Sequence, residues 1–381
     1  IAGLLGGGLV LQADSPADVR RNAISHNRAM MGGGVFLTSV TQVQMRDNQI
    51  EFNQATQGGG GVAMIGSHPT IVNQAIRWNQ GGSYGGGLLI QGSSQPQILD
   101  SVIGFNTAGA GGGVSVSESP NLRFTGNQVI RNQATNGTGG AMLLLNTNGQ
   151  VSRNQFASNT ARSGGGAMTI NHSNPMVFAN RFLLNNADST GGALLVQNGA
   201  APTILSNEIY GNRAGSQGAG VMVSAANPRL TNNTIAENGG SGAGDGVRLS
   251  NVSQVEITGN VIIGHRIGIS ANGDNQAVLV RNNLWQNNAD YVGIQRGATD
   301  LAVDPKYVSG PTARFYLSHQ AAGQQFTSPL VDAGLRTAAE IGLNEVSTRT
   351  DEVRDTGRAD LGVHYLPFSG APRLWIPLVR F

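Results

Sequence analysis

The sequence has no cysteine, one lysine and few charged or aromatic residues, which make up 12% and 5% of its 381 residues. A disulfide framework is therefore excluded. The formal net charge is +2, and the basic residues are arginines scattered along the sequence. Nucleic-acid-binding proteins concentrate positive charge on one face, which this pattern does not predict, so no nucleic-acid partner is expected. No run of 18 apolar residues occurs, which excludes a transmembrane helix.

Glycine is abundant, with 56 residues, and its clusters recur with a period near 26 residues. In residues 48–70, for example, an Asn-x-apolar-x-x-Asn-x-Ala run precedes four glycines and a short apolar segment. The second asparagine of this motif, here called the marker, recurs at Asn27, Asn53, Asn79, Asn106, Asn132, Asn159, Asn185, Asn212 and Asn238. His265 then takes its place, and Asn287 ends the series. We predict eleven coils, in which the marker amides form a structural ladder.

Apolar residues keep fixed positions in every coil. One column lies three residues before the marker, as at Ile50, and another lies eight before it, as at Met45. An apolar-x-apolar triplet such as Val62 to Met64 follows the glycines, and this period of two indicates a short strand. Each coil thus contains three short strands without a helical pattern between them.

These features predict an all-β fold, a parallel β-solenoid of about 11 coils over residues 1–290. The coil length, the three-strand cross-section and the Asn and Gly corners resemble the right-handed parallel β-helix of pectate-lyase-like proteins. The Gly-Gly-Gly-Val style also resembles repeats of bacterial surface proteins. The resemblance covers roughly residues 6–290 and implies the fold rather than the function. The apolar opening 1–11 fits the repeat, so we interpret it as a strand of the mature protein from which an upstream segment was removed.

The repeat stops near Tyr291, and residues 291–365 are predicted to form an irregular C-terminal cap. This region resembles the closing segment of many secreted bacterial β-helix proteins in the order of its motifs, which are Asp304-Pro305, Ser328-Pro329 and Asp360-Leu361-Gly362. Tyr365 stands where that segment usually has Glu. The Pro-rich apolar tail 366–381 is expected to dock on its own solenoid or on a neighbouring chain.

Catalytic signals are sparse. The Asn-Thr-Asp, Asp-Asp, Gly-His-Gly and Arg-Ile-Lys series of galacturonase-like enzymes is missing. Asp245, Arg248 and His265 form the best polar cluster and are the candidates for catalysis, although an active site needs convergent groups. Repeated glycine clusters without helices are interpreted as corners rather than phosphate-binding loops. The calcium-binding nonapeptide period is missing as well, so we expect neither a metal nor a cofactor.

The outward position of the post-glycine strand is unexpectedly apolar. A solvated face would be polar there, so this column is expected to be an interface covered either by the C-terminal cap or by a partner molecule. The predicted interface residues are Val10, Phe36, Leu89, Leu143, Leu195 and Met222, together with Trp375, Ile376 and Leu378 of the tail.

Two functions remain open from the sequence. The first is a non-enzymatic structural or adhesive protein, extracellular or on the cell surface of a bacterium, that self-associates head to tail into filaments or a surface layer. The second is a protein that binds or cleaves polysaccharides along one face. The missing catalytic series favours the first.

Overall fold

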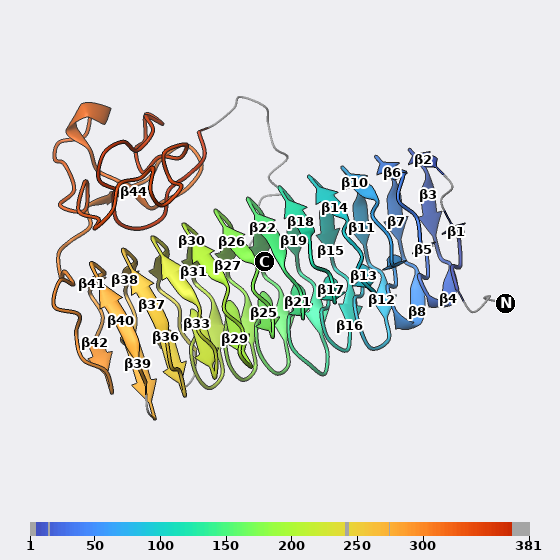
Figure 1. The fold of residues 1–381 in the computed structure, drawn as a ribbon, viewed down its shortest axis with the longest axis horizontal. Helices are drawn as coiled ribbons and strands as arrows, with labels where there is room; N and C mark the ends of the chain where they lie inside the picture. The colour runs from blue at the N-terminus through green and yellow to red at the C-terminus, as the bar shows by residue number, and fades with distance from the viewer. Residues whose placement is uncertain (1–4, 14–15, 241–243, 274, 368–381) are drawn as a thin grey trace.

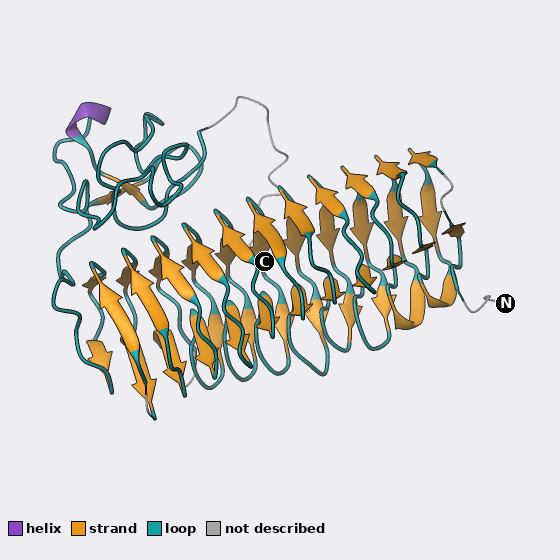
Figure 2. Ribbon diagram, in the orientation of Figure 1, coloured by secondary structure: helices purple, strands orange, loops and turns teal. Residues whose placement is uncertain are grey.

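The protein is described by a computed structural model for residues 5–13, 16–240, 244–273 and 275–367. Its main body is a rod of stacked coils in which strands pair in parallel with their equivalents in the neighbouring coils (Figures 1 and 2). The predicted all-β parallel solenoid of about eleven coils is confirmed. Coils are numbered here by their marker residue, from Asn27 in coil 1 to Asn287 in coil 11.

Three long sheets run the length of the rod, each taking one strand from every coil. Sheet one, which follows the glycines, has twelve strands: β1 (Leu9–Gln12), β5 (Val35–Thr38), β9 (Val62–Ile65), β13 (Leu88–Gln91), β17 (Val114–Ser117), β21 (Met142–Leu145), β25 (Met168–Asn171), β29 (Leu194–Gln197), β33 (Val221–Ser224), β36 (Asp245–Ser250), β39 (Ile267–Asn272) and β42 (Ala289–Val292). Sheet two has eleven: β2 (Ala17–Arg20), β6 (Val43–Arg46), β10 (Thr70–Val72), β14 (Gln97–Leu99), β18 (Leu122–Thr125), β22 (Gly149–Ser152), β26 (Met176–Phe178), β30 (Thr203–Leu205), β34 (Arg229–Thr231), β37 (Val255–Thr258) and β40 (Ala277–Val280). Sheet three also has eleven: β3 (Ala23–Ser25), β7 (Gln49–Glu51), β11 (Ala75–Arg77), β15 (Val102–Gly104), β19 (Gln128–Ile130), β23 (Gln155–Ala157), β27 (Arg181–Leu183), β31 (Glu208–Tyr210), β35 (Thr234–Ala236), β38 (Val261–Ile263) and β41 (Asn283–Trp285).

A fourth column of short strands, which the sequence pattern did not predict, directly follows the marker residue in coils 1 to 8. Its strands are β4 (Arg28–Met31), β8 (Gln54–Gly58), β12 (Gln80–Gly81), β16 (Thr107–Ala108), β20 (Gln133–Ala134), β24 (Thr160–Ala161), β28 (Asn186–Ala187) and β32 (Arg213–Ala214). Most have two residues and carry the small Ala or Gly of the motif, so the hydrophobic alternation that marks a longer strand is missing.

The core lies inside the coils and is built from in-register columns. Ile50, Ile76 and Ile103 are backbone partners in successive strands of sheet three, and all three are fully buried. Met45 and Ile71 pair in the same way in sheet two. Each inward side chain therefore packs on its counterpart one coil away, which is the basic contact of stacked strands.

The marker asparagines form a hydrogen-bonded ladder at the end of sheet three. The Asn53 side-chain amide donates to Asn79 Oδ1 at 3.0 Å and to the Ile24 carbonyl at 2.8 Å. A second ladder lies between sheets two and three, where Asn127, for example, donates to Asn154 Oδ1 at 3.1 Å. Both ladders end near coil 11, since Asn287 Nδ2 donates to Asp290 Oδ1 at 2.9 Å and the Asn282 backbone N–H donates to Asp300 Oδ1 at 2.8 Å.

The cap follows β42, and its first residues pair with the last coil through Asp300 and Leu301, while most of the cap lies against the side of the last coils (Figure 1). It contains β43 (Tyr307–Val308), the antiparallel β44 (Tyr316–Leu317) and one 3₁₀ turn, η1 (Gln320–Ala322). Apolar cap residues such as Leu343 and Leu361 pack on the outward side chains Phe178 and Val261 of sheets two and three. The same two sheets stay uncovered by the cap in coils 1 to 5. Among the described residues no helix has the length and apolarity needed to cross a membrane.

Candidate functional site

Asp245, one of the predicted catalytic candidates, lies at the start of β36 with both carboxylate oxygens engaged. Its Oδ1 accepts a hydrogen bond from Arg266 at 2.9 Å, and its Oδ2 accepts one from the Ser270 hydroxyl at 2.7 Å. Arg248 is the backbone partner of Ser270, and its Nε is buried without a partner among the described residues. Asp245 is thus held as a buried ion-pair member.

His265, the third candidate, is part of the marker ladder rather than a neighbour of the Asp245 carboxylate. Its Nε2 lies 3.2 Å from Asn238 Nδ2, and its Nδ1 lies 3.2 Å from Asn287 Oδ1. Burial lowers the pKa of His265 to about 4, against an opposing contribution from the Asn287 bond. The neutral ring therefore accepts from coil 9 and donates to coil 11, as a ladder amide would.

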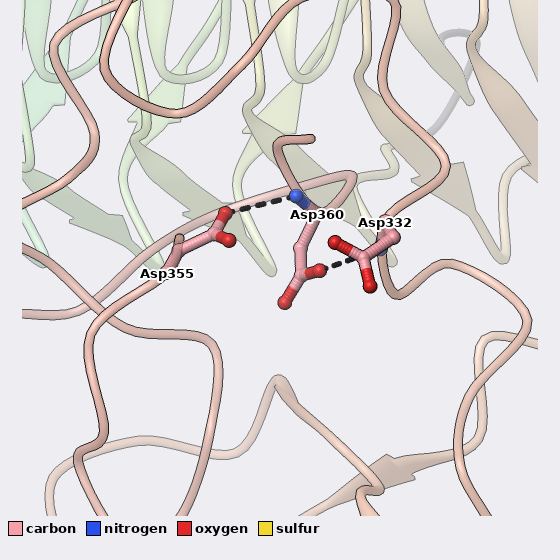
Figure 3. A group of neighbouring side chains, drawn as sticks. All are labelled: Asp332, Asp355 and Asp360. Carbon is pink, nitrogen blue, oxygen red and sulfur yellow. Dashed lines mark hydrogen bonds between the residues drawn. The ribbon is translucent and has the colours of Figure 1, made fainter. Parts of the chain in front are cut away.

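Three carboxylates in the cap point toward one another, from Asp332, Asp355 and Asp360 (Figure 3). Their oxygens lie within 4.8 Å of one another, a spacing that could suit a cation. Asp360 already accepts from the Asp332 backbone N–H at 2.7 Å and from the Thr348 hydroxyl, and Asp355 Oδ2 accepts from the Asp360 N–H at 2.9 Å.

The same group is tied to the solenoid. Asp355 Oδ2 lies 2.7 Å from Nε2 of the fully buried His364, whose backbone N–H donates to the Ser206 hydroxyl at 2.8 Å. Burial and the neighbouring Asp355 charge raise the pKa of Asp360. Because the Asp355 and Asp360 carboxylates are engaged by the protein's own donors, we assign the cluster to the architecture of the cap.

The apolar column, predicted to be an interface under the C-terminal cap or a partner, is not accessible to either. Phe36, Leu89, Leu143, Leu195 and Met222 are only 2 to 8% exposed, and of this column's predicted residues only Val10 is open, at 39%. The cover is neither the cap nor a partner but the chain's own glycine turns. Trp375, Ile376 and Leu378 of the predicted interface lie outside the described residues.

Gly58 shows how these turns cover the column. A Cβ built on it would lie 2.9 Å from Leu89 Cδ2 and 2.5 Å from the Tyr84 carbonyl oxygen. Only glycine permits so close an approach of the turn to the column. The glycines thus explain why outward residues of sheet one are apolar.

A different outer surface carries an exposed row of aromatic rings. It lies at the corner between sheet three and the fourth column, one residue before each marker, and we call His26, Phe52, Trp78, Phe105 and Arg131 the outer row. Neighbouring rings are stacked with centroids 5.2–5.3 Å apart and planes within 4–20°. Phe52 and Trp78 are 45% and 41% exposed.

Polar side chains flank the outer row on both sides. The position after the marker carries Arg28, Gln54, Gln80, Thr107 and Gln133, here called the amide row. Gln54, Gln80 and Gln133 are exposed, and their side chains make no hydrogen bond with any described residue. On the other side, Arg77 Nε lies 3.6 Å from Glu51 Oε1. The corner therefore presents ring edges beside unengaged amides.

The rings occupy a strained backbone position. Phe52, Trp78 and Phe105 have φ of 56°, 52° and 58°, a left-handed conformation that is unusual for bulky residues. Coils 8 and 10 have Gly211 and Gly264 at the same corner, also with positive φ. Ser158, Leu184 and Glu237 occupy this corner in coils 6, 7 and 9 with φ of 56°, 55° and 51°, so the left-handed angle is a property of the coil and not of the rings.

The outer row was not predicted from the sequence. Its signal was present as an aromatic residue before the marker in four successive coils. Side chains at corners do not alternate between the inside and the outside of the coil. The two-residue period of strands therefore does not predict whether a corner side chain is buried or exposed. The exposed ring stack becomes visible only when the corners are placed above one another.

Comparisons with known proteins address the fold. A family model described as right handed beta helix region matches residues 1–156, 130–243 and 182–303, whereas a comparison with curated proteins found no match. The solved structure of the periplasmic alginate epimerase AlgG is similar, with a TM-score of 0.53 at 14% identity over 77% of this chain and 74% of that chain. A double mutant of it gives a TM-score of 0.53 at 14% identity over 77% and 75%. A single mutant gives 0.52 at 13% over 78% and 77%. This likeness shows the fold alone.

Proposed function

Since the chain belongs to the right-handed β-helix family, we propose that it binds a polysaccharide along the outer row of coils 1 to 5, outside the cytoplasm, without cleaving it. The observation that carries this proposal is the exposed stack of rings beside the amide row. The fold of a periplasmic alginate epimerase supports both a polysaccharide ligand and the location.

The stacking of the rings decides which groups of a ligand they can meet. Neighbouring rings cover each other's faces at 5.2–5.3 Å, so within the stack solvent reaches mainly the ring edges. The edge of an aromatic ring is electropositive and attracts oxygen atoms, whereas a nucleobase needs an open face. The Trp78 indole N–H adds a hydrogen-bond donor. A polyhydroxylated chain fits this surface better than a nucleic acid.

Affinity electrophoresis through gels that contain single polysaccharides tests the proposal. We expect retardation of the protein by at least one polysaccharide, and about tenfold weaker binding by Trp78→Ala, a loss comparable to one buried aromatic contact. Arg153→Gln, on the corner between sheets two and three, serves as the control. Absence of retardation by every neutral and acidic polysaccharide of the panel would refute the proposal.

Catalysis is tested on the same samples. We expect no new reducing or unsaturated ends, because Asp245 and His265 are engaged by their own neighbours. Release of such ends that is lost on Asp245→Ala or His265→Ala would overturn the non-catalytic part of the proposal.

Self-association is a second candidate, favoured by the inward residues of coil 1. Val19 and Ile24 are only partly buried, whereas their counterparts Met45 and Ile50 in coil 2 are fully buried. A second copy stacked on this end would cover them, and a stacking interface of this kind propagates. Electron microscopy and sedimentation with and without residues 366–381 test this, and a monomer at high concentration in both cases would rule it out.

A further inference from the structure

The geometry of the outer corner points to a narrower ligand class, a linear acidic polysaccharide that lies lengthwise along the rod with its carboxylates directed to arginines. This inference rests on the proposed function and adds the charge, the direction and the repeat of the ligand. Its grounds are the charges around the outer row, the placement of the arginines and their spacing along the rod.

The corner is electropositive. In coils 1 to 5, the outer row, the amide row and the adjoining position of sheet three contain one carboxylate, Glu51, and three arginines, Arg28, Arg77 and Arg131. Glu51 lies beside Arg77 at 3.6 Å, so its charge is offset locally. Such a strip attracts an anionic chain, and a neutral chain gains nothing from it.

Two of the arginines are placed by the rings themselves. The Arg77 guanidinium lies 5.6 Å from the Trp78 ring centroid, and the Arg131 guanidinium lies 5.6 Å from the Phe105 ring centroid. Contacts at this distance are favourable cation–π interactions. The guanidinium fork is suited to carboxylates, which it can bind with two parallel hydrogen bonds. The ring stack therefore also positions cationic groups.

The three arginines lie in alternate coils, Arg28 in the amide row, Arg131 in the outer row and Arg77 on the sheet-three flank. Arg28, Arg77 and Arg131 belong to coils 1, 3 and 5. Strands in neighbouring coils are about 4.8 Å apart, so the arginines follow one another at about 10 Å along the axis. An extended, ribbon-like β-1,4-linked chain turns alternate sugars to the same side. A uronate chain of this form presents a carboxylate on that side once per disaccharide, a length close to two coils.

Calorimetry with two matched hexasaccharides tests the inference. One is a hexamer of β-1,4-linked glucuronate, and the other is cellohexaose, which has the same backbone with each carboxylate replaced by a hydroxymethyl group. We expect at least about tenfold tighter binding of the acidic hexamer, and a difference that shrinks as salt rises from about 0.05 to about 0.5 M.

Variants locate the contact. Arg131→Gln and Arg28→Gln should each weaken the acidic hexamer by about tenfold and leave cellohexaose unchanged, since each removes one charge-assisted contact. Arg153→Gln removes the same charge from another corner and should change neither. Circular dichroism and thermal unfolding verify that each variant is folded.

The outcomes separate this inference from the proposed function. Equal affinity for the two hexamers, or an equal loss with Arg153→Gln, would overturn the acidic ligand and leave polysaccharide binding in place. If neither hexamer bound while a neutral polysaccharide retarded the protein, the inference of an acidic ligand would be overturned as well. Failure of every polysaccharide would remove the proposed function itself.

Discussion

The solenoid has two aromatic stacks, one inside the coils and one at the outer corner. Inside, Phe156 stacks on Phe182 with centroids 5.0 Å apart and on Phe124 at 6.4 Å, and all three rings are fully buried. Outside, Phe52 and Trp78 stack at 5.2 Å yet are nearly half exposed. Any column of aromatic residues will stack in a repeat of this kind, so stacking alone indicates no function.

The difference lies in what each stack does for stability. The inner rings sit on strands with ordinary backbone angles and remove their whole apolar surface from water. The outer rings sit at a corner that has positive φ in every coil, and they leave much of their surface in water. The inner stack therefore stabilises the fold, while the outer stack leaves apolar surface in water, which favours a role in binding.

The largest effect is expected from Phe156→Ala. Truncation of a fully buried ring leaves a cavity between two neighbouring rings and should lower the free energy of unfolding by about 3 to 5 kcal/mol. Chemical denaturation measures this loss, and polysaccharide affinity of the folded variant should stay unchanged. A neutral result would mean that the interior columns collapse around the gap and that the two stacks do not differ as described.

A second effect concerns the interior ladder and pH. Burial holds the pKa of His265 at about 4, below its ordinary value of 6.5. Between these values the unfolded chain binds a proton that the folded chain excludes, so this contribution to stability is full above pH 6.5 and falls as the pH drops toward 4. His265→Asn removes it.

We therefore expect the acid sensitivity of the two proteins to differ. Between about pH 7 and about pH 4.5, the natural chain should lose roughly 2 to 3 kcal/mol more than His265→Asn. Denaturation curves at both pH values give the difference, in which the contributions of the carboxylates, common to both proteins, cancel. If the two chains lost stability in parallel, the ring would be accessible to protons in the folded state.

The smallest effect isolates the strain of the outer row. Trp78→Gly and Trp78→Ala remove the same ring, but only glycine adopts φ near 52° without strain. The glycine variant should therefore be more stable than the alanine variant by about 1 kcal/mol, with both losing binding. Equal stabilities would show that the corner relaxes and that the rings are kept at no cost.

The repeat made the fold predictable and left the site largely hidden. Inward residues such as Ile50 and Ile103 recur at fixed spacing because each must pack on its counterpart, so their burial can be predicted from the spacing alone. The burial of Leu89 could not be predicted in this way, since it depends on how closely the turn at Gly58 approaches the Leu89 side chain. Trp78 was missed because a corner residue follows no strand period. The cap contact of Ser206 with His364 joins positions far apart in the chain, which no local pattern reveals.

The two asparagine ladders give the rod a polarity. Each amide donates one N–H to the amide oxygen of the next coil and the other to a backbone carbonyl of the preceding coil, so the amide-to-amide bonds all point the same way and their donor end lies at coil 11. At that end both ladders finish on a carboxylate, Asp290 in one and Asp300 in the other. A negative charge there complements the aligned N–H groups, as an anion does at the start of an α-helix. A carboxylate has no N–H to pass on to a further coil, so this end is chemically closed, and stacking of copies would have to proceed without extending either ladder from it.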